Sequence, residues 1–240
     1  MKILAIESSA GSASAAIVEE EKVLGEFFTN TRLTHSQTLM PMVESLLRCT
    51  AISLDDIDAF AAAVGPGSFT GLRIGVAAVK GLARAREKPC IPVSTLEAMA
   101  YHVPLWDGVV CGVMDARCKQ VYTALFAVEN QQIKRLTPDE AISLEELKGR
   151  LAAVKKKVIL VGDGAQLCYN ECKDLPGVCL ASPQMRFQRA AGVGMRALEL
   201  AQEGRKVTPQ ELSVTYLRLP QAERELKKKQ AAGQNKSCQE

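Results

Sequence analysis

The sequence predicts an α/β protein of two units, and three observations support that prediction. Short runs rich in β-forming residues alternate with runs that are apolar at helical spacing. Two apolar strands end in glycine-containing joints that lead into helices, at residues 65–75 and 162–164. The chain has 240 residues, 47% hydrophobic and 24% charged, which suits one large domain or two small ones with a sizeable core.

The first unit, residues 1–102, opens with three predicted strands. Residues 2–6, 14–18 and 23–28 are rich in β-forming side chains, and the short gaps between them suit hairpin turns. The unit continues with a helix at 35–49, a helical turn capped by Ser53 and Asp56, and a buried strand at 59–64. A helix at 72–86 follows and is stopped by Pro89. The unit ends with a strand at 91–93 and a helix capped by Ser94 and Glu97.

Three antiparallel strands followed by helix, strand, helix and strand form the element order of a ribonuclease-H-like half-domain. Actin and the sugar kinases pair two such halves around a nucleotide. We therefore expect the actin-like ATPase fold, an α/β architecture with two lobes.

The second unit, residues 103–189, is smaller and follows a loop marked by Pro104, Asp107 and Gly108. Its first predicted elements are strands at 109–114, 120–128 and 133–136, and a turn at Asn130-Gln131 joins the last two. A helix that begins at Ser143 and Glu146 follows, and then a strand at 158–161 before the second glycine-containing joint. A helix at 190–203 lies in a terminal segment, 190–219, and the polar residues 220–240 are expected to form a disordered tail.

Composition argues against several classes of protein. The net charge is only +3, and most of it falls in the tail, so the body offers no case for tight independent nucleic-acid binding. The apolar run at 3–6 ends at Glu7, too short for a secretion signal, and nothing later approaches a membrane span. The eight cysteines are scattered without a CxxC pair, and there are only two histidines, so we expect a cytoplasmic protein with reduced thiols and no metal site.

The most informative stretch is GPGSFTGLRIG, from Gly65 to Gly75. It lies between a predicted strand and a predicted helix, where the backbone must turn sharply or let another group approach closely. Its free amides are also compatible with an anion site at a helix start. It is neither a Walker A loop nor a GxGxxG fingerprint, because it lacks the Gly-Lys-Ser/Thr ending and the required glycine spacing.

As a family signature the stretch is more specific. The sequence resembles the TsaB (YeaZ) family over roughly residues 2–219. The matching segments are Ile6-Glu7-Ser8-Ser9, His35-Ser36 with Leu39 and Pro41, the glycine-rich stretch, Asp115-Ala116-Arg117 followed by Val121-Tyr122, and Tyr216-Leu217-Arg218. The resemblance implies the actin-like fold, with the helix at 190–203 returning to pack on the first unit. It also implies a non-catalytic, scaffolding role beside TsaD in the synthesis of N6-threonylcarbamoyladenosine next to the tRNA anticodon.

The resemblance further implies partners. The helix at 35–49 would join TsaD in a heterodimer, or a second copy of this chain when TsaD is absent. TsaE would associate, tRNA would be reached through the complex, and ATP or ADP would lie near the heterodimer junction. The wide apolar surface of this helix and its methionines fit a partner interface, although a helix buried on two sides would show the same pattern. The candidate partner-binding residues are His35, Ser36, Leu39, Met40, Met42, Val43 and Leu46.

An independent nucleotide-binding ATPase or kinase of the same fold is the alternative function. Its candidate residues are Ser8, Ser9, Gly65, Gly67, Ser68, Arg73 and Asp115. The serines can instead satisfy their own turn, and Arg117 can simply close a turn on Asp115 by an ion pair. Catalytic relatives carry a metal-binding His-x3-His pair, but the fourth residue after His35 is Leu39, so we expect neither catalytic nor metal-binding residues in this chain.

Overall fold

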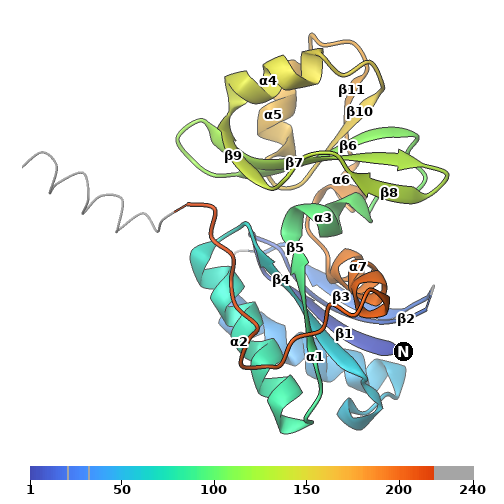
Figure 1. Cartoon of the computed structure of the whole chain (residues 1–240). Helices are drawn as coiled ribbons and strands as arrows, with labels where there is room; N and C mark the ends of the chain where they lie inside the picture. Colours follow the sequence, from blue (N-terminus) through green and yellow to red (C-terminus); the bar gives the residue numbers. More distant parts are fainter. Residues whose placement is uncertain (21, 32, 219–240) are drawn as a thin grey trace, which may run out of the picture.

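Two mixed sheets organise the computed structural model, which describes residues 1–20, 22–31 and 33–218 (Figure 1). The first sheet has the strand order β3-β2-β1-β4-β5. Its strands are β1 (Lys2–Glu7), β2 (Ala13–Glu19), β3 (Lys22–Thr29), β4 (Ala59–Gly65) and β5 (Cys90–Ser94). The first three strands pair antiparallel, and β4 and β5 continue the sheet in parallel.

Helices cover both faces of this sheet, which explains why its central strands are apolar throughout. Helices α1 (His35–Thr50) and α2 (Phe69–Ala85) lie on one face, and α7 (Ala190–Gln202) lies on the other (Figure 1). Along β1 the side chains alternate, so that Leu4 and Ile6 pack in the α1–α2 core while Ile3 and Ala5 pack in the α7 core. This sheet and its helices form the first lobe.

The second lobe repeats the topology of the first. Its sheet has the order β8-β7-β6-β10-β11, and from β8 to β11 it has two antiparallel pairs followed by two parallel pairs, as the first sheet has from β3 to β5. Its elements are β6 (Gly108–Asp115), β7 (Gln120–Glu129), β8 (Gln132–Arg135), β9 (Glu140–Ser143), α4 (Leu144–Ala152), β10 (Val158–Val161), α5 (Ala165–Cys172) and β11 (Val178–Leu180). Strand β9 adds a second antiparallel partner to β7.

Three connections link the lobes. The chain leaves the first lobe through α3 (Thr95–Ala100), whose apolar residues join the core beneath the second sheet, and it returns through α6 (Pro183–Arg186) to α7. After α7 the chain forms an antiparallel bridge between Val207 and Cys90. It then runs beside α2 toward the space between the lobes, where the Thr215 amide donates to the Val64 carbonyl (2.8 Å; Figure 1).

The observed elements confirm the predicted actin-like, two-lobed fold. The capping box at Ser53 and the turn at Asn130-Gln131, where both residues have positive φ, are present. Helix α2 begins three residues before the predicted position, at Phe69, because the Ser68 side chain caps it by accepting from the Gly71 amide. Strands β9 and β11 and helix α6 were not predicted, since each has only three or four residues.

Two further expectations from the sequence concern the C-terminal tail and membrane-spanning helices. Residue 219 and the predicted disordered tail at 220–240 lie outside the described residues. Over the part of the chain that the structure describes, no helix is long and apolar enough to cross a membrane.

Candidate functional site

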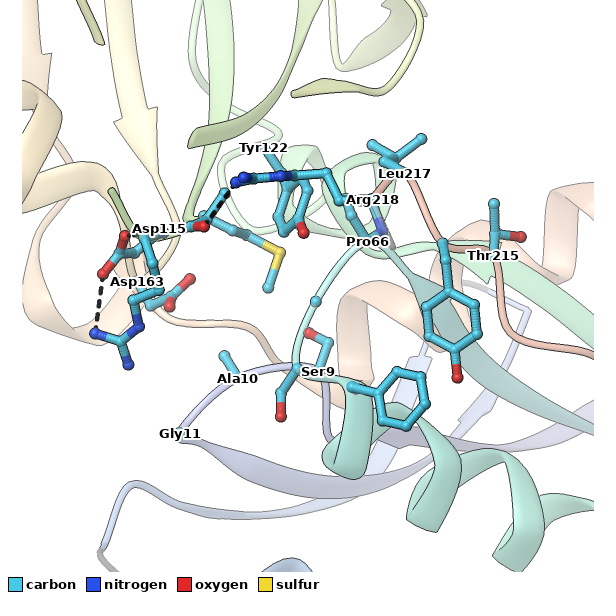
Figure 2. Close-up of a pocket in the computed structure, with 17 residues that line it drawn as sticks. Ser9, Ala10, Gly11, Pro66, Asp115, Tyr122, Asp163, Thr215, Leu217 and Arg218 are labelled. Atoms are coloured by element: carbon cyan, nitrogen blue, oxygen red, sulfur yellow. Dashed lines mark hydrogen bonds and ion pairs between the residues drawn. The ribbon is translucent and has the colours of Figure 1, made fainter. Parts of the chain in front are cut away.

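A cavity of about 460 Å³ opens between the two lobes (Figure 2). It is lined by the β1–β2 turn, the loop before α2 with the first residue of α2, the residues at the ends of β6 and β10, Tyr122 of β7, and the last described residues. The polar and aromatic lining residues are Ser9, Ser68, Phe69, Asp115, Arg117, Tyr122, Asp163, Thr215, Tyr216 and Arg218. Of the predicted nucleotide-binding residues, Ser9, Gly67, Ser68 and Asp115 lie here, whereas Ser8, Gly65 and Arg73 do not line the cavity.

The glycine-rich stretch is a close-packing joint between α2 and the first hairpin. A Cβ added to Gly71 would overlap the Ser8 carbonyl oxygen, and one added to Gly67 would overlap the Ser9 carbonyl oxygen. The Ser68 amide donates to that same Ser9 oxygen (2.6 Å). This amide is therefore already bonded and is not a free donor for an anion, which favours the close-approach interpretation of the motif over the phosphate-loop interpretation.

Two of the serines in the first hairpin tie the turn to other parts of the chain, so the expectation that they satisfy their own turn is wrong. The Ser8 hydroxyl donates to the Gly71 carbonyl (2.9 Å), and the Ser12 hydroxyl donates to the Gln188 carbonyl (3.2 Å). The Ser9 Oγ is buried and has no hydrogen-bond partner among the described residues. The turn is thus held between α2 and the segment that returns to α7.

Glu7 is a buried carboxyl directly behind the cavity. It is 1% exposed, and its Oε1 accepts from the Ser9 amide (2.6 Å), while its Oε2 has no partner among the described residues. Burial, reinforced by the nearby charge of Asp163, raises the pKa of Glu7 to about 7. A carboxyl with this pKa is partly protonated at neutral pH.

The second lobe contributes two carboxyls that line the cavity, Asp115 and Asp163. Burial raises the pKa of Asp163, whose Oδ1 accepts from the Gln188 amide group (2.7 Å). Asp115 accepts from the backbone amide of Arg117 (2.7 Å) and from its guanidinium (3.3 Å), as predicted for a closed turn (Figure 2). Within residues 1–20, 22–31 and 33–218, no three His, Cys, Asp or Glu side chains are arranged to hold a metal ion.

Sequence reasoning missed Asp163, Tyr122, Tyr216 and Arg218 as cavity residues. The Gly162-Asp163-Gly164 joint was the available signal for Asp163, because it marks the carboxyl end of a parallel strand, where α/β folds place their ligands. Arg218 belongs to the Tyr216-Leu217-Arg218 segment that matches the family, but no local pattern places it in a cavity. It reaches the cavity only because the chain returns along α2, and its Nη1 donates to the Ala116 carbonyl (2.9 Å) of the other lobe.

Arg73 does not line the cavity, but it contacts two residues that do, Phe69 and Tyr216. Its Nε donates to the Tyr216 hydroxyl (2.9 Å), and its guanidinium lies 3.8 Å above the Phe69 ring. Phe69 and Tyr216 stack on each other with ring centroids 5.0 Å apart. This cluster holds the last described segment against the start of α2.

Helix α1 contains two kinds of predicted partner-binding residue. Four of them, Leu39, Met42, Val43 and Leu46, are buried in the core of this chain. Their burial corrects the expectation that Leu39, Met42 and Leu46 form a docking surface, whereas Val43 also lines a groove on the surface. The exposed positions are Ser36 and Met40, the latter 44% exposed. Because Met40 and Met42 are about 200° apart on a helix, one faces solvent when the other is buried.

His35 begins α1 and links it to the first hairpin. Its Nε2 donates to the Ala10 carbonyl (2.7 Å), and its Nδ1 has no partner among the described residues. His35 therefore positions the start of the helix against the first hairpin. Farther along the helix, Pro41 lies in the interior rather than in the first turn.

A shallow apolar groove runs between α1 and α2. Its volume is about 430 Å³, and it is lined by Met40, Pro41, Val43, Glu44, Leu47, Leu54 and Leu82. Among these described lining residues, only Glu44 is charged. An exposed apolar groove of this kind is typical of a surface that another protein covers.

Comparisons with known proteins agree with this architecture. The family model described as TsaD, tRNA N6-adenosine threonylcarbamoyltransferase, matches residues 22–223. The tRNA threonylcarbamoyladenosine biosynthesis protein TsaB of Bacillus subtilis is 33% identical, over 93% of this chain and 96% of its own. The Escherichia coli protein of the same name is also 33% identical, over 91% of this chain and 95% of its own.

A solved structure extends the likeness to three dimensions. YeaZ from Pseudomonas aeruginosa has a TM-score of 0.76 and 26% identity, and the match covers 90% of this chain and 99% of that one. Sequence and structure thus agree over nearly the whole length. The chain belongs to the TsaB family of tRNA threonylcarbamoyladenosine biosynthesis proteins.

Proposed function

We propose that this chain acts in tRNA threonylcarbamoyladenosine synthesis as a non-catalytic scaffold that binds and activates TsaD. The transfer of the threonylcarbamoyl group to the N6 of adenosine then takes place on TsaD. The named TsaB relatives support the pathway, and the match to the TsaD family model supports a place in a TsaD-containing complex.

The groove between α1 and α2 is the observation that most favours a docking role. Its apolar lining faces solvent in the single chain, and Met40 at its edge is 44% exposed. Covering such a surface releases water, which contributes about 25 cal/mol per Å² of apolar area. A flexible, polarizable methionine adapts to the shape of a partner helix. When TsaD is absent, the same groove would pair with a second copy of this chain.

Further components belong to the same proposal. TsaE and ATP or ADP would associate at the junction with TsaD, in the cytoplasm, and tRNA would bind to the assembled complex. The Ser68 amide, which would be a phosphate donor in a nucleotide site, already donates to the Ser9 carbonyl, which favours nucleotide binding at the junction over binding by this chain alone.

The docking role predicts that Met40→Glu prevents pairing with TsaD. The substitution places a charge in the groove, where burial against a partner would desolvate it, so the affinity should fall at least about tenfold. Gel filtration with light scattering measures complex formation, and the same samples are assayed for tRNA modification.

Met185→Glu is the matched control. Met185 is 46% exposed in α6, remote from the groove, and its substitution should leave pairing unchanged. If Met40→Glu and Met185→Glu pair equally well with TsaD, the groove is not the docking surface. If the unaltered chain neither pairs with TsaD nor supports modification, the scaffold role itself is wrong.

A further inference from the structure

Helix α2 presents a row of three cations on one side. Arg73, Lys80 and Arg84 are separated by seven and four residues, so their side chains leave the helix within about 40° of one another. At 1.5 Å per residue the row is roughly 16 Å long. Leu82, in the groove against α1, leaves the helix on the opposite side. The cation row and the proposed TsaD-docking groove are therefore separate surfaces of the same helix.

No carboxylate among the described residues neutralises this row. Arg73 donates to the Tyr216 hydroxyl, and Lys80 donates to the Gln210 carbonyl (3.2 Å), both uncharged acceptors. Arg84 forms no ion pair within the described residues. By contrast, Arg86, only two residues beyond Arg84 and off the row, pairs with Asp55 (2.8 Å). The row thus keeps three positive charges available to an outside partner.

The row continues at both ends into features that suit a nucleic acid. Beyond the C-terminal end of α2 it opens into a hollow of about 660 Å³ that is lined by Arg84, Lys88 and Lys206. Glu87 and Glu211 also line the hollow, so its three cations exceed its carboxylates by one. The Glu211 carboxylate is held toward Thr208, whose amide (2.9 Å) and hydroxyl (2.8 Å) donate to it. At the other end, Tyr216 stacks on Phe69 and is 40% exposed.

We propose that this surface, the row with Lys88, Lys206 and Tyr216, binds the phosphate backbone of the tRNA substrate in the assembled complex. The inference rests on the proposed function, because it places this chain beside TsaD during modification. A linear series of unpaired cations tracks a polyanion, and an exposed tyrosine offers a face for an unstacked base. Helix α2 and the terminal segment run side by side (Figure 1). Arg73 and Lys80 of α2 donate to Tyr216 and Gln210 of that segment, and Arg84, Lys88 and Lys206 line one hollow.

The near-neutral body predicts that the surface adds to binding by the complex rather than binding tRNA alone. Each phosphate contact makes the negative slope of log affinity against log salt steeper by about 0.7 to 0.9. Losing two contacts should therefore make the slope shallower by about 1.5 and weaken binding roughly tenfold at moderate salt.

The test uses the complex of the full chain with TsaD and an unmodified tRNA transcript. We expect Lys80→Glu combined with Arg84→Glu to weaken tRNA binding roughly tenfold and to flatten its salt dependence, while pairing with TsaD is retained. Lys80→Gln with Arg84→Gln should show a smaller effect of the same sign. Lys155→Glu with Lys173→Glu makes the same charge change at exposed lysines of the second lobe and should alter the affinity less than about twofold.

Three results would overturn the inference. One is an unchanged tRNA affinity and salt slope in the Lys80 and Arg84 variants. Another is loss of TsaD pairing by those folded variants, which would make the row a contact for an acidic protein surface. The third is an equal loss of tRNA binding in the second-lobe control, which would show a nonspecific effect of net charge. Failure of the unaltered chain to pair with TsaD would instead refute the proposed function on which the inference rests.

Discussion

Glu7 shows how a single residue couples the cavity to pH. Its folded-state pKa of about 7 lies above the usual carboxyl value, because burial disfavours the charged form. Well below about pH 4.5 the residue is protonated in both the folded and the unfolded chain, so its ionisation does not affect the free energy of unfolding. As the pH rises from there through 7, the unfolded chain ionises first, so the free energy of unfolding falls by roughly 3 kcal/mol.

Glu7→Gln should remove that pH dependence. The side-chain carbonyl oxygen of the introduced glutamine would still accept from the Ser9 amide, and no buried charge would form. The variant should match the wild type near pH 4.5 and exceed its free energy of unfolding by up to about 3 kcal/mol at about pH 8. Denaturant unfolding at several pH values measures this, with the exposed Glu171→Gln as control. Equal pH profiles for Glu7→Gln and wild type would contradict the assignment of a raised pKa.

At the residue scale, sequence patterns predicted some parts of the site and missed others for identifiable reasons. The Asp115–Arg117 turn was predictable because its partners are two residues apart. The partner of Ser8 lies 63 residues away, and that of Ser12 lies 176 residues away, so only the folded chain shows what these hydroxyls bind. The burial of Leu39 and Leu46 was equally ambiguous, because an apolar side chain fits a core and an interface alike.

At the element scale, α2 depends on two glycines in opposite ways. Gly71 packs on the Ser8 carbonyl with no room for a methyl group, whereas Gly81 has no atom near its Cβ position. Gly71→Ala should therefore destabilise the protein by about 1–3 kcal/mol through overpacking. Gly81→Ala should stabilise it by roughly 0.5–1 kcal/mol, since alanine favours the helix. Thermal and denaturant unfolding measure both changes, and the same sign for the two would refute the close-packing role of the motif.

The longer elements were predictable because their apolar spacing is strong and their caps are local. Ser94 and Ser143 each accept from the amide three residues ahead, as the sequence predicted. The start of α2 was placed too late, because the expected glycine loop is in fact the first helical turn under the Ser68 cap. Strands as short as β11, which pairs in parallel with β10 after a helix, leave too few residues for a recognisable pattern.

At the scale of the whole molecule, the order of elements predicted two lobes, but it could not predict how the lobes are held together. The terminal segment makes that connection through contacts between residues far apart in sequence. Thr215 bonds Val64 in the first lobe, and Arg218 bonds Ala116 in the second. A scaffold must present its groove and its cation row in a fixed relation to a partner, so this connection bears directly on the proposed function.

Arg218→Ala should loosen the connection between the lobes without unfolding either one. The lost bond, from a half-buried guanidinium to a carbonyl, is worth about 1 kcal/mol, which corresponds to a fall in Tm of about 2–4 °C. Amide exchange should rise several-fold at 115–119 and stay unchanged in β1, as measured by mass spectrometry. Tyr216→Phe is the control, since it removes only the bond to Arg73 within the first lobe. If amide exchange at 115–119 rises equally in both variants, or in neither, the Arg218 contact does not hold the lobes together. The two chain crossings at α3 and α6 would then be enough to hold them.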